Sequence, residues 1–104
     1  MAAPDFSLRT ERRDASLEVV AAGELDMAAA FKLESGLDPL LDDEAVEAVQ
    51  LDLSEVDFVD SAGLGALLAL RERAQDRGIA LEISRASDPV RRLLGLTGLG
   101  DALP

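Results

Sequence analysis

The sequence predicts a single α/β domain, in which helices pack on a mixed, largely parallel β-sheet of about four strands. Stretches with the hydrophobic period of a strand alternate along the chain with stretches that have the period of a helix. Strands separated by helices need crossover connections, and these produce a parallel sheet core. A chain of 104 residues with 48% hydrophobic content is sufficient for one domain, and no Pro/Gly/Ser-rich linker divides it.

The first elements are expected to be a β-hairpin. An edge strand begins at Phe6 and Leu8, and residues 12–15 form the turn. Gly23 is expected to end the second strand. Leu17, Val19 and Ala21 mark this second strand, because apolar residues recur there at every second position.

A helix follows the hairpin, with Asp26 suited to cap its first turn. Gly36 and Pro39 interrupt the helical pattern, because proline lacks the backbone donor and collides with the preceding turn. We therefore expect a kink or a break at residues 36–38. The spacing of the apolar residues predicts one buried face, made of Ala30, Leu33, Leu37, Leu40 and Leu41.

The next strand is a half-buried or central one, since Val49, Leu51 and Leu53 alternate with less apolar neighbours. It leads to Ser61 and to a second helix, for which Gly78 is the expected C′ residue. The first half of this helix is predicted to be mostly buried and its second half exposed. Its apolar positions are Leu64, Leu67, Leu68, Leu70 and Ala74.

A last strand and a short helix complete the predicted domain. Alternation of Ile79, Leu81 and Ile83 predicts the strand. Asp88 is expected to cap the helix, with Pro89 at its first position, where a missing N–H costs nothing.

Ser61 is the residue of most functional interest, because it falls at or next to the N-cap of the second predicted helix. Its hydroxyl can accept from a free backbone N–H there, and a phosphate on that oxygen would meet the positive end of the helix dipole. Gly63 and Gly65 suggest that another group, such as a kinase active site, approaches the backbone closely. Position alone favours a capping role for Ser61.

Other polar residues allow two interpretations each. Asp26, Asp57 and Asp60 either converge near Ser61 or serve as turn and cap residues, and the turn role is favoured for Asp57. Ser54 is interpreted as a loop-capping residue. Six arginines could form a local basic patch: Arg71, Arg73, Arg77, Arg85, Arg91 and Arg92. We favour instead the interpretation that Arg71, Arg73 and Arg77 complement the C-terminus of a helix.

Composition argues against several functions. The chain has no cysteine and no histidine, which removes thiolate metal sites, disulfides and the usual general base. We therefore expect no enzyme activity, no catalytic residue, no metal site and no cofactor. A formal charge of −11 and only three aromatic residues argue against binding to nucleic acids or anionic membranes. Neither a signal peptide nor an apolar run of membrane-spanning length is present, so a cytoplasmic location is expected.

Several separated motifs together resemble the STAS domain, in that family's order and spacing. They are Gly-Glu-Leu-Asp at 23–26, Leu-Asp-Leu-Ser at 51–54, Val-Asp-Phe-Val-Asp-Ser-Ala-Gly-Leu-Gly at 56–65, Asp-Pro-Val-Arg-Arg-Leu-Leu at 88–94 and Thr-Gly-Leu at 97–99. The resemblance spans about residues 6–99, so residues 1–104 are interpreted as a single STAS domain. More narrowly, the chain is similar to the stand-alone anti-sigma-factor antagonists of bacteria.

This resemblance implies a partner-switching regulator of transcription. In the subfamily, the serine that matches Ser61 is phosphorylated by the partner anti-sigma factor, itself a serine kinase, and a PP2C-type phosphatase resets it. The unphosphorylated antagonist binds the anti-sigma factor, and phosphorylation releases it. The resemblance places Asp26 and Asp60 beside the serine, on a partner-binding surface that also includes Ala62, Gly63 and Leu64.

Two departures from the family pattern stand out. Where related antagonists continue with another strand or extended segment and a final helix, this chain ends at Pro104. We therefore expect the family's last packing layer to be missing, and apolar surface to be exposed that favours a homodimer. Ala62 stands where the family often has a second hydroxyl, which leaves Ser61 as the only local acceptor of a phosphate.

The alternative function is a binding module that is never phosphorylated. Similar domains serve as small accessory subunits of bacterial lipid-transport ATPases and as components of stress-sensing assemblies. An enzyme acting through Ser61 is a third class, which the absence of histidine disfavours.

Overall fold

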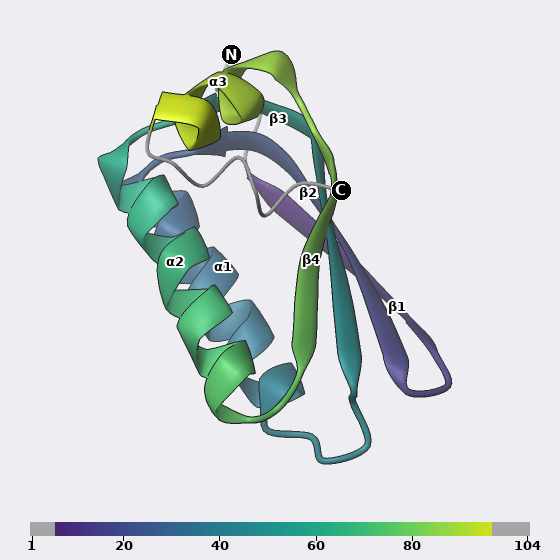
Figure 1. Cartoon of the computed structure of the whole chain (residues 1–104). Coiled ribbons are helices and arrows are strands. Elements are labelled where there is room, and N and C mark those ends of the chain that lie inside the picture. The colour runs from purple at the N-terminus through teal and green to yellow at the C-terminus, as the bar shows by residue number, and fades with distance from the viewer. Residues whose placement is uncertain (1–5, 97–104) are drawn as a thin grey trace.

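A computed structural model describes residues 6–96, which form a mixed four-stranded sheet and three helices (Figure 1). The predicted α/β class and the largely parallel sheet are confirmed. The strand order is β1-β2-β3-β4, in which β1 pairs antiparallel with β2 and the other two pairs are parallel. The motif at 97–99 and the chain end lie outside the described residues. In chain order the elements are β1 (Ser7–Arg13), β2 (Ser16–Leu25), α1 (Met27–Leu41), β3 (Ala48–Val59), α2 (Ser61–Asp76), β4 (Ala80–Ala86) and α3 (Asp88–Leu96).

Helices α1 and α2 lie side by side against the sheet, and the core fills the space between them and the strands (Figure 1). α3 packs against β3 and adds Val90 and Leu94 to the same core. The core is entirely apolar within the described residues. Its largest fully buried side chains are Leu25, Leu33, Leu37, Leu51, Leu53, Leu70, Val19, Val49, Val56 and Val90.

The hairpin is tighter than predicted, because Arg12 and Arg13 belong to β1 and pair with Leu17 and Ser16. The turn consists of residues 14–15, and Asp14 adopts a φ of 55°, a left-handed conformation that aspartate tolerates better than most residues. The prediction that Gly23 ends the second strand is also wrong. Gly23 has a φ of 103° and lies next to a register shift at which β3 carries the extra residue, Asp57, and β2 continues past it to Leu25.

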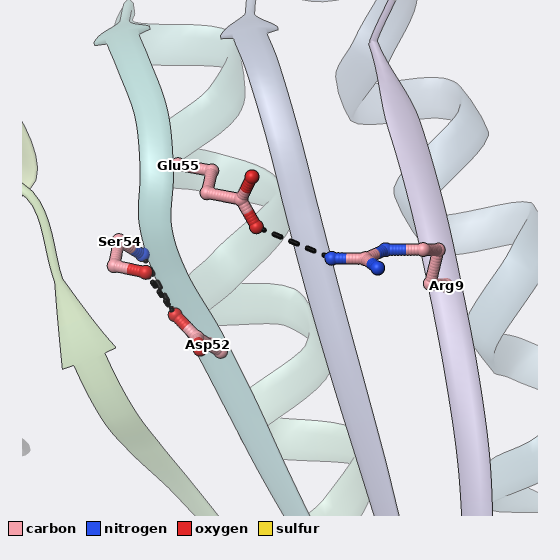
Figure 2. Close-up of polar contacts among 4 residues, drawn as sticks. All are labelled: Arg9, Asp52, Ser54 and Glu55. Carbon is pink, nitrogen blue, oxygen red and sulfur yellow. Dashed lines mark hydrogen bonds and ion pairs between the residues drawn. The ribbon is translucent and has the colours of Figure 1, made fainter.

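β3 is one of the two inner strands, which agrees with the central-strand alternative of the prediction, and its register relative to β2 is irregular. Relative to β2, its register shifts once between Asp52 and Glu55 and again between Val56 and Phe58. At the first shift, the Asp52 carboxylate accepts hydrogen bonds from the Ser54 backbone N–H (2.9 Å) and from its hydroxyl (2.6 Å) (Figure 2). The inward positions therefore become Leu53, Val56 and Val59, which are three residues apart.

Figure 2 also shows the sheet face that points away from the helices, where Arg9 of β1 reaches across β2 to Glu55 of β3. The two side chains form an exposed ion pair at 3.3 Å. Ser54 lies inside β3 rather than at a strand end, so its predicted loop-capping role is wrong. Asp57 likewise lies within β3 and not in a turn.

α1 runs without a break through Gly36 and Pro39, contrary to the sequence-based expectation. Pro39 lies in the last turn, where its missing N–H removes a single helical hydrogen bond, the one to the carbonyl of the exposed Ser35. Gly36 makes room for the edge strand, because a Cβ there would lie 3.1 Å from a methyl carbon of Leu8. The buried face differs from the predicted one in two residues, because Leu40 is half-buried and Ala29 is buried in addition; it comprises Ala29, Ala30, Leu33, Leu37 and Leu41.

The end of α2 is as predicted, whereas the start of α3 is not. α2 ends in a Schellman motif, in which Gly78 has a φ of 70°, as predicted for C′. Gly78 N–H donates to the Gln75 carbonyl (3.1 Å) and Ile79 N–H donates to the Ala74 carbonyl (2.8 Å). The predicted start of α3 is wrong by one residue: Ser87 rather than Asp88 is the capping residue, since its hydroxyl accepts from Val90 N–H at 3.5 Å, and Pro89 is the second helical residue and not the first.

Candidate partner-binding site

Both long helices begin at the same edge of the sheet, because β2 and β3 are parallel and each leads directly into a helix (Figure 1). An aspartate caps each helix in the same way. The Asp26 carboxylate accepts from Ala29 N–H at 3.0 Å, and the Asp60 carboxylate accepts from Gly63 N–H at 2.9 Å. The predicted capping role of Asp26 is confirmed. Each bond satisfies one of the free N–H groups of a first helical turn.

The two helix starts are in direct contact. Asp60 N–H donates to the carbonyl of Leu25, the last residue of β2, at 3.3 Å. Gly63 packs so closely on the same residue that a Cβ at 63 would lie 2.2 Å from the Leu25 carbonyl oxygen. Because Leu25 directly precedes Asp26, this packing brings Asp26 next to the segment that carries Asp60 and Ser61.

Ser61 is the first residue of α2 and not its cap. Asp60 takes the capping role that the sequence also allowed for Ser61, because a carboxylate caps as well as a hydroxyl does. Ser61 is exposed, and none of the residues described, 6–96, forms a hydrogen bond with its hydroxyl. The hydroxyl is therefore accessible, at the positive end of the α2 dipole.

The other predicted surface residues differ in how accessible they are. Ala62 and Leu64 are half-buried, as are Asp26 and Asp60, whereas Gly63 is buried. The close approach to the backbone that Gly63 predicted exists, but the approaching group is the protein's own Leu25. Gly65 is exposed, and nothing lies within 4 Å of where its Cβ would be.

Two ion pairs join α1 to the end of α2. Arg73 of α2 pairs with Asp38 of α1, and Arg77, just past α2, pairs with Asp42 at 2.6 Å. These two arginines therefore pair with carboxylates at the end of α1 and do not form a free basic patch, a role that neither sequence-based interpretation named. In each pair the two residues are 35 positions apart in the sequence. Asp26 and Ser61 have the same separation. Because the helices run in the same direction, Asp26 lies about level with Ser61.

The sequence analysis did not identify two exposed apolar residues near this site. Met27 and Phe31, both on α1, are 74% and 73% exposed. A helical projection of residues 27–41 would have found them, because neither falls on the face formed by Ala30, Leu33 and Leu37.

A separate groove of about 270 Å³ lies between the later turns of α2 and β4. Leu68, which was predicted to be buried, is 38% exposed in it, and Arg71 and Leu81 also line it. It is distinct from the site around Ser61. Self-association through exposed apolar surface remains a prediction.

Residues 6–96 contain neither a group of three or more acidic side chains able to hold a metal ion nor a helix long and apolar enough to cross a membrane. The site around Ser61 combines a hydroxyl, the two capping carboxylates of Asp26 and Asp60, and small or apolar side chains. Such a surface can bind a protein partner, and its chemistry can be changed by modifying the hydroxyl.

Comparison with known proteins connects this site to a family. The family model described as "Mlab, STAS domain" matches residues 8–104. The anti-sigma-B factor antagonist of Listeria monocytogenes is 30% identical over 100 residues, which cover 95% of this chain and 87% of that protein. The anti-sigma-B factor antagonist of Staphylococcus aureus is 30% identical over 99 residues, or 95% of this chain and 91% of that protein. These relatives are antagonists, which are binding proteins and not enzymes.

Solved structures show the same fold. An anti-sigma factor antagonist from Mycobacterium paratuberculosis superposes with a TM-score of 0.84 at 30% identity, covering 100% of this chain and 88% of that one. The anti-sigma factor antagonist SpoIIAA in its unphosphorylated form gives a TM-score of 0.80 at 22% identity, covering 96% of this chain and 86% of that one.

Proposed function

This chain belongs to the STAS domain family, and we propose that within this family it is an anti-sigma-factor antagonist that acts by partner switching. The observation that carries the proposal is the exposed Ser61 hydroxyl at the first position of α2, beside the capping carboxylates of Asp26 and Asp60. The names of the Listeria and Staphylococcus relatives support it. The protein would act in the cytoplasm, where a bacterial sigma factor acts.

In the unphosphorylated state, the chain presents the start of α2 to an anti-sigma factor and displaces the sigma factor held there. Ser61, Ala62 and Leu64 supply the contact, together with Asp26 and Asp60. Gly63 supports this surface from below, because it fixes the start of α2 against β2. The partner is itself a serine kinase and transfers the γ-phosphoryl group of ATP to the Ser61 oxygen, which loses its proton as ADP leaves.

Phosphorylation then weakens the complex by electrostatics and desolvation. A phosphate adds about −1.5 to −2 charges at pH 7, next to two carboxylates. The α2 dipole offsets part of this within the free protein, by about 0.3–1 kcal/mol. At a desolvated interface, the unmatched charge is expected to cost on the order of 2–5 kcal/mol of binding. The lower figure corresponds to roughly thirtyfold weaker binding. A PP2C-type phosphatase restores the hydroxyl.

Intact-mass spectrometry tests the modification. The chain is incubated with ATP and each candidate anti-sigma kinase of the source organism, and wild type is compared with Ser61→Ala. Ser54→Ala is the matched control, because Ser54 is also exposed but lies in the middle of β3. We expect one phosphate on wild type and on Ser54→Ala, and none on Ser61→Ala. Phosphate on Ser61→Ala would contradict the assignment of Ser61.

The same experiment distinguishes partner switching from the alternative function. A STAS module that is never phosphorylated, such as an accessory subunit of a lipid-transport ATPase or of a stress-sensing assembly, would gain no phosphate with any kinase. It would also retain an ATPase or a scaffold protein in a pull-down and no kinase.

A further inference from the structure

α1 carries two large apolar side chains on its outer surface, within its first five residues. Met27 and Phe31 are 74% and 73% exposed, more than any other large hydrophobic residue in the described part of the chain. They are four residues apart and therefore stand one above the other on the same side of the helix. Single exposed apolar residues are common, but an adjacent pair beside a candidate interface is informative.

The ion pair at the other end of α1 shows which way this side faces. Asp38 follows Phe31 by seven residues, which is about two helical turns, so the two residues share a side of α1. Asp38 reaches Arg73 of α2, so this side borders α2. Met27 and Phe31 therefore stand along the border between the two helices and not on the β1 side, where Gly36 approaches Leu8.

The facing side of α2 has only short side chains at this level. Residues 62, 66 and 69 have the spacing that places them on the same side of α2 as Arg73, and all three are alanine. Short side chains cannot cover a methionine and a phenylalanine that stand beside them. This explains why the two large residues stay exposed although a neighbouring helix is present.

The pair is also continuous with the proposed partner-binding surface. Met27 directly follows Asp26, which lies about level with Ser61. Phe31 follows Asp26 by five residues, which corresponds to about 7.5 Å along the axis of α1. A partner that covers Ser61 and Asp26 would therefore reach Phe31 with little additional area, since standard interfaces extend over about 800 Å² per partner.

We propose that Met27 and Phe31 are the apolar anchor of the surface that binds the anti-sigma kinase, an inference that rests on the proposed function. The complementary surface on the kinase is apolar and bordered by basic side chains, which match Asp26 and Asp60. Aromatic anchors beside a polar rim are typical of the residues that dominate protein interfaces. Because Phe31 is away from the phosphorylated oxygen, it contributes to docking and not to phosphoryl transfer.

The test measures binding and phosphorylation by the cognate anti-sigma kinase for wild type, Phe31→Ser and Met27→Ser. Phe58→Ser is the matched control. Phe58 is 47% exposed, and strand alternation places it on the opposite sheet face from Leu25 and Val59. For Phe31→Ser we expect a Kd at least tenfold higher than that of wild type. The KM for phosphorylation should rise by a similar factor at unchanged kcat, with an unchanged Tm. Phe58→Ser should stay within twofold of wild type.

The two proposals fail in different ways. If wild type binds and is phosphorylated while Phe31→Ser and Met27→Ser bind within twofold of wild type, the anchor is refuted and the proposed function stands. Equal weakening by Phe58→Ser would also refute the anchor, because any loss of apolar surface would then have the same effect. If wild type binds no anti-sigma kinase, the proposed function fails and the anchor fails with it.

Discussion

Replacing Gly63 by alanine should destabilise the fold, although alanine is the better helix former. The added Cβ would lie 2.2 Å from the Leu25 carbonyl oxygen and 2.8 Å from Leu25 Cγ, so α2 must move away from β2. Overpacking of this kind costs about 1–3 kcal/mol. The movement also strains the bond from Asp60 N–H to the same carbonyl, worth about 0.5–1.5 kcal/mol. Higher helix propensity offsets up to about 1 kcal/mol of this, so the net loss lies between about 0.5 and about 4.5 kcal/mol.

Gly65→Ala is the matched control, because it lies in the same turn of α2 and nothing occupies the space its Cβ would fill. It should stabilise the protein by up to about 1 kcal/mol through helix propensity. Thermal and urea unfolding followed by circular dichroism should give shifts of opposite sign, at about 4–8 °C per kcal/mol for a domain of this size. If Gly63→Ala were as stable as wild type, the close packing of α2 on Leu25 would be refuted.

Two further predictions concern side chains that bond to the backbone. Asp60→Ala should lower the free energy of unfolding by about 1 kcal/mol through loss of the α2 cap, whereas Asp60→Ser should restore most of it in the same urea titration. The Ala45 N–H and the Arg12 guanidinium lower the pKa of Asp43 from its ordinary 3.8. Its ionised form therefore adds stability above about pH 3.8, which is lost as the pH falls through the lowered pKa of the folded state. Asp43→Asn should flatten this part of the stability curve, and an unchanged curve would contradict the pKa assignment.

Element order and type could be predicted from the sequence, because the apolar period changes clearly between strands and helices. Leu17, Val19 and Ala21 alternate as a strand does, and Leu33, Leu37 and Leu41 recur as on a helix. Residues that usually interrupt strands and helices gave wrong predictions at two positions, Gly23 and Pro39. β2 continues past Gly23 because its pairing with β3 is maintained. Pro39 removes only one hydrogen bond of α1, because it lies in the last turn of the helix.

The candidate site was predicted in outline, because Asp26, Asp60 and Ser61 follow directly after apolar strands whose ends must meet at one edge of a parallel sheet. Its details depend on contacts between distant segments. That Asp60 rather than Ser61 caps α2 could not be decided from residue preference alone. The bulges of β3, which shift its inward positions to Leu53, Val56 and Val59, leave no regular pattern in the sequence.

The most direct test of partner switching is a calorimetric titration of the cognate anti-sigma kinase with two forms of the chain, unphosphorylated and phosphorylated on Ser61. The account predicts that phosphorylation weakens binding by roughly thirtyfold or more, and that Ser61→Ala binds as the unphosphorylated form does. Equal affinities of the two forms would contradict it.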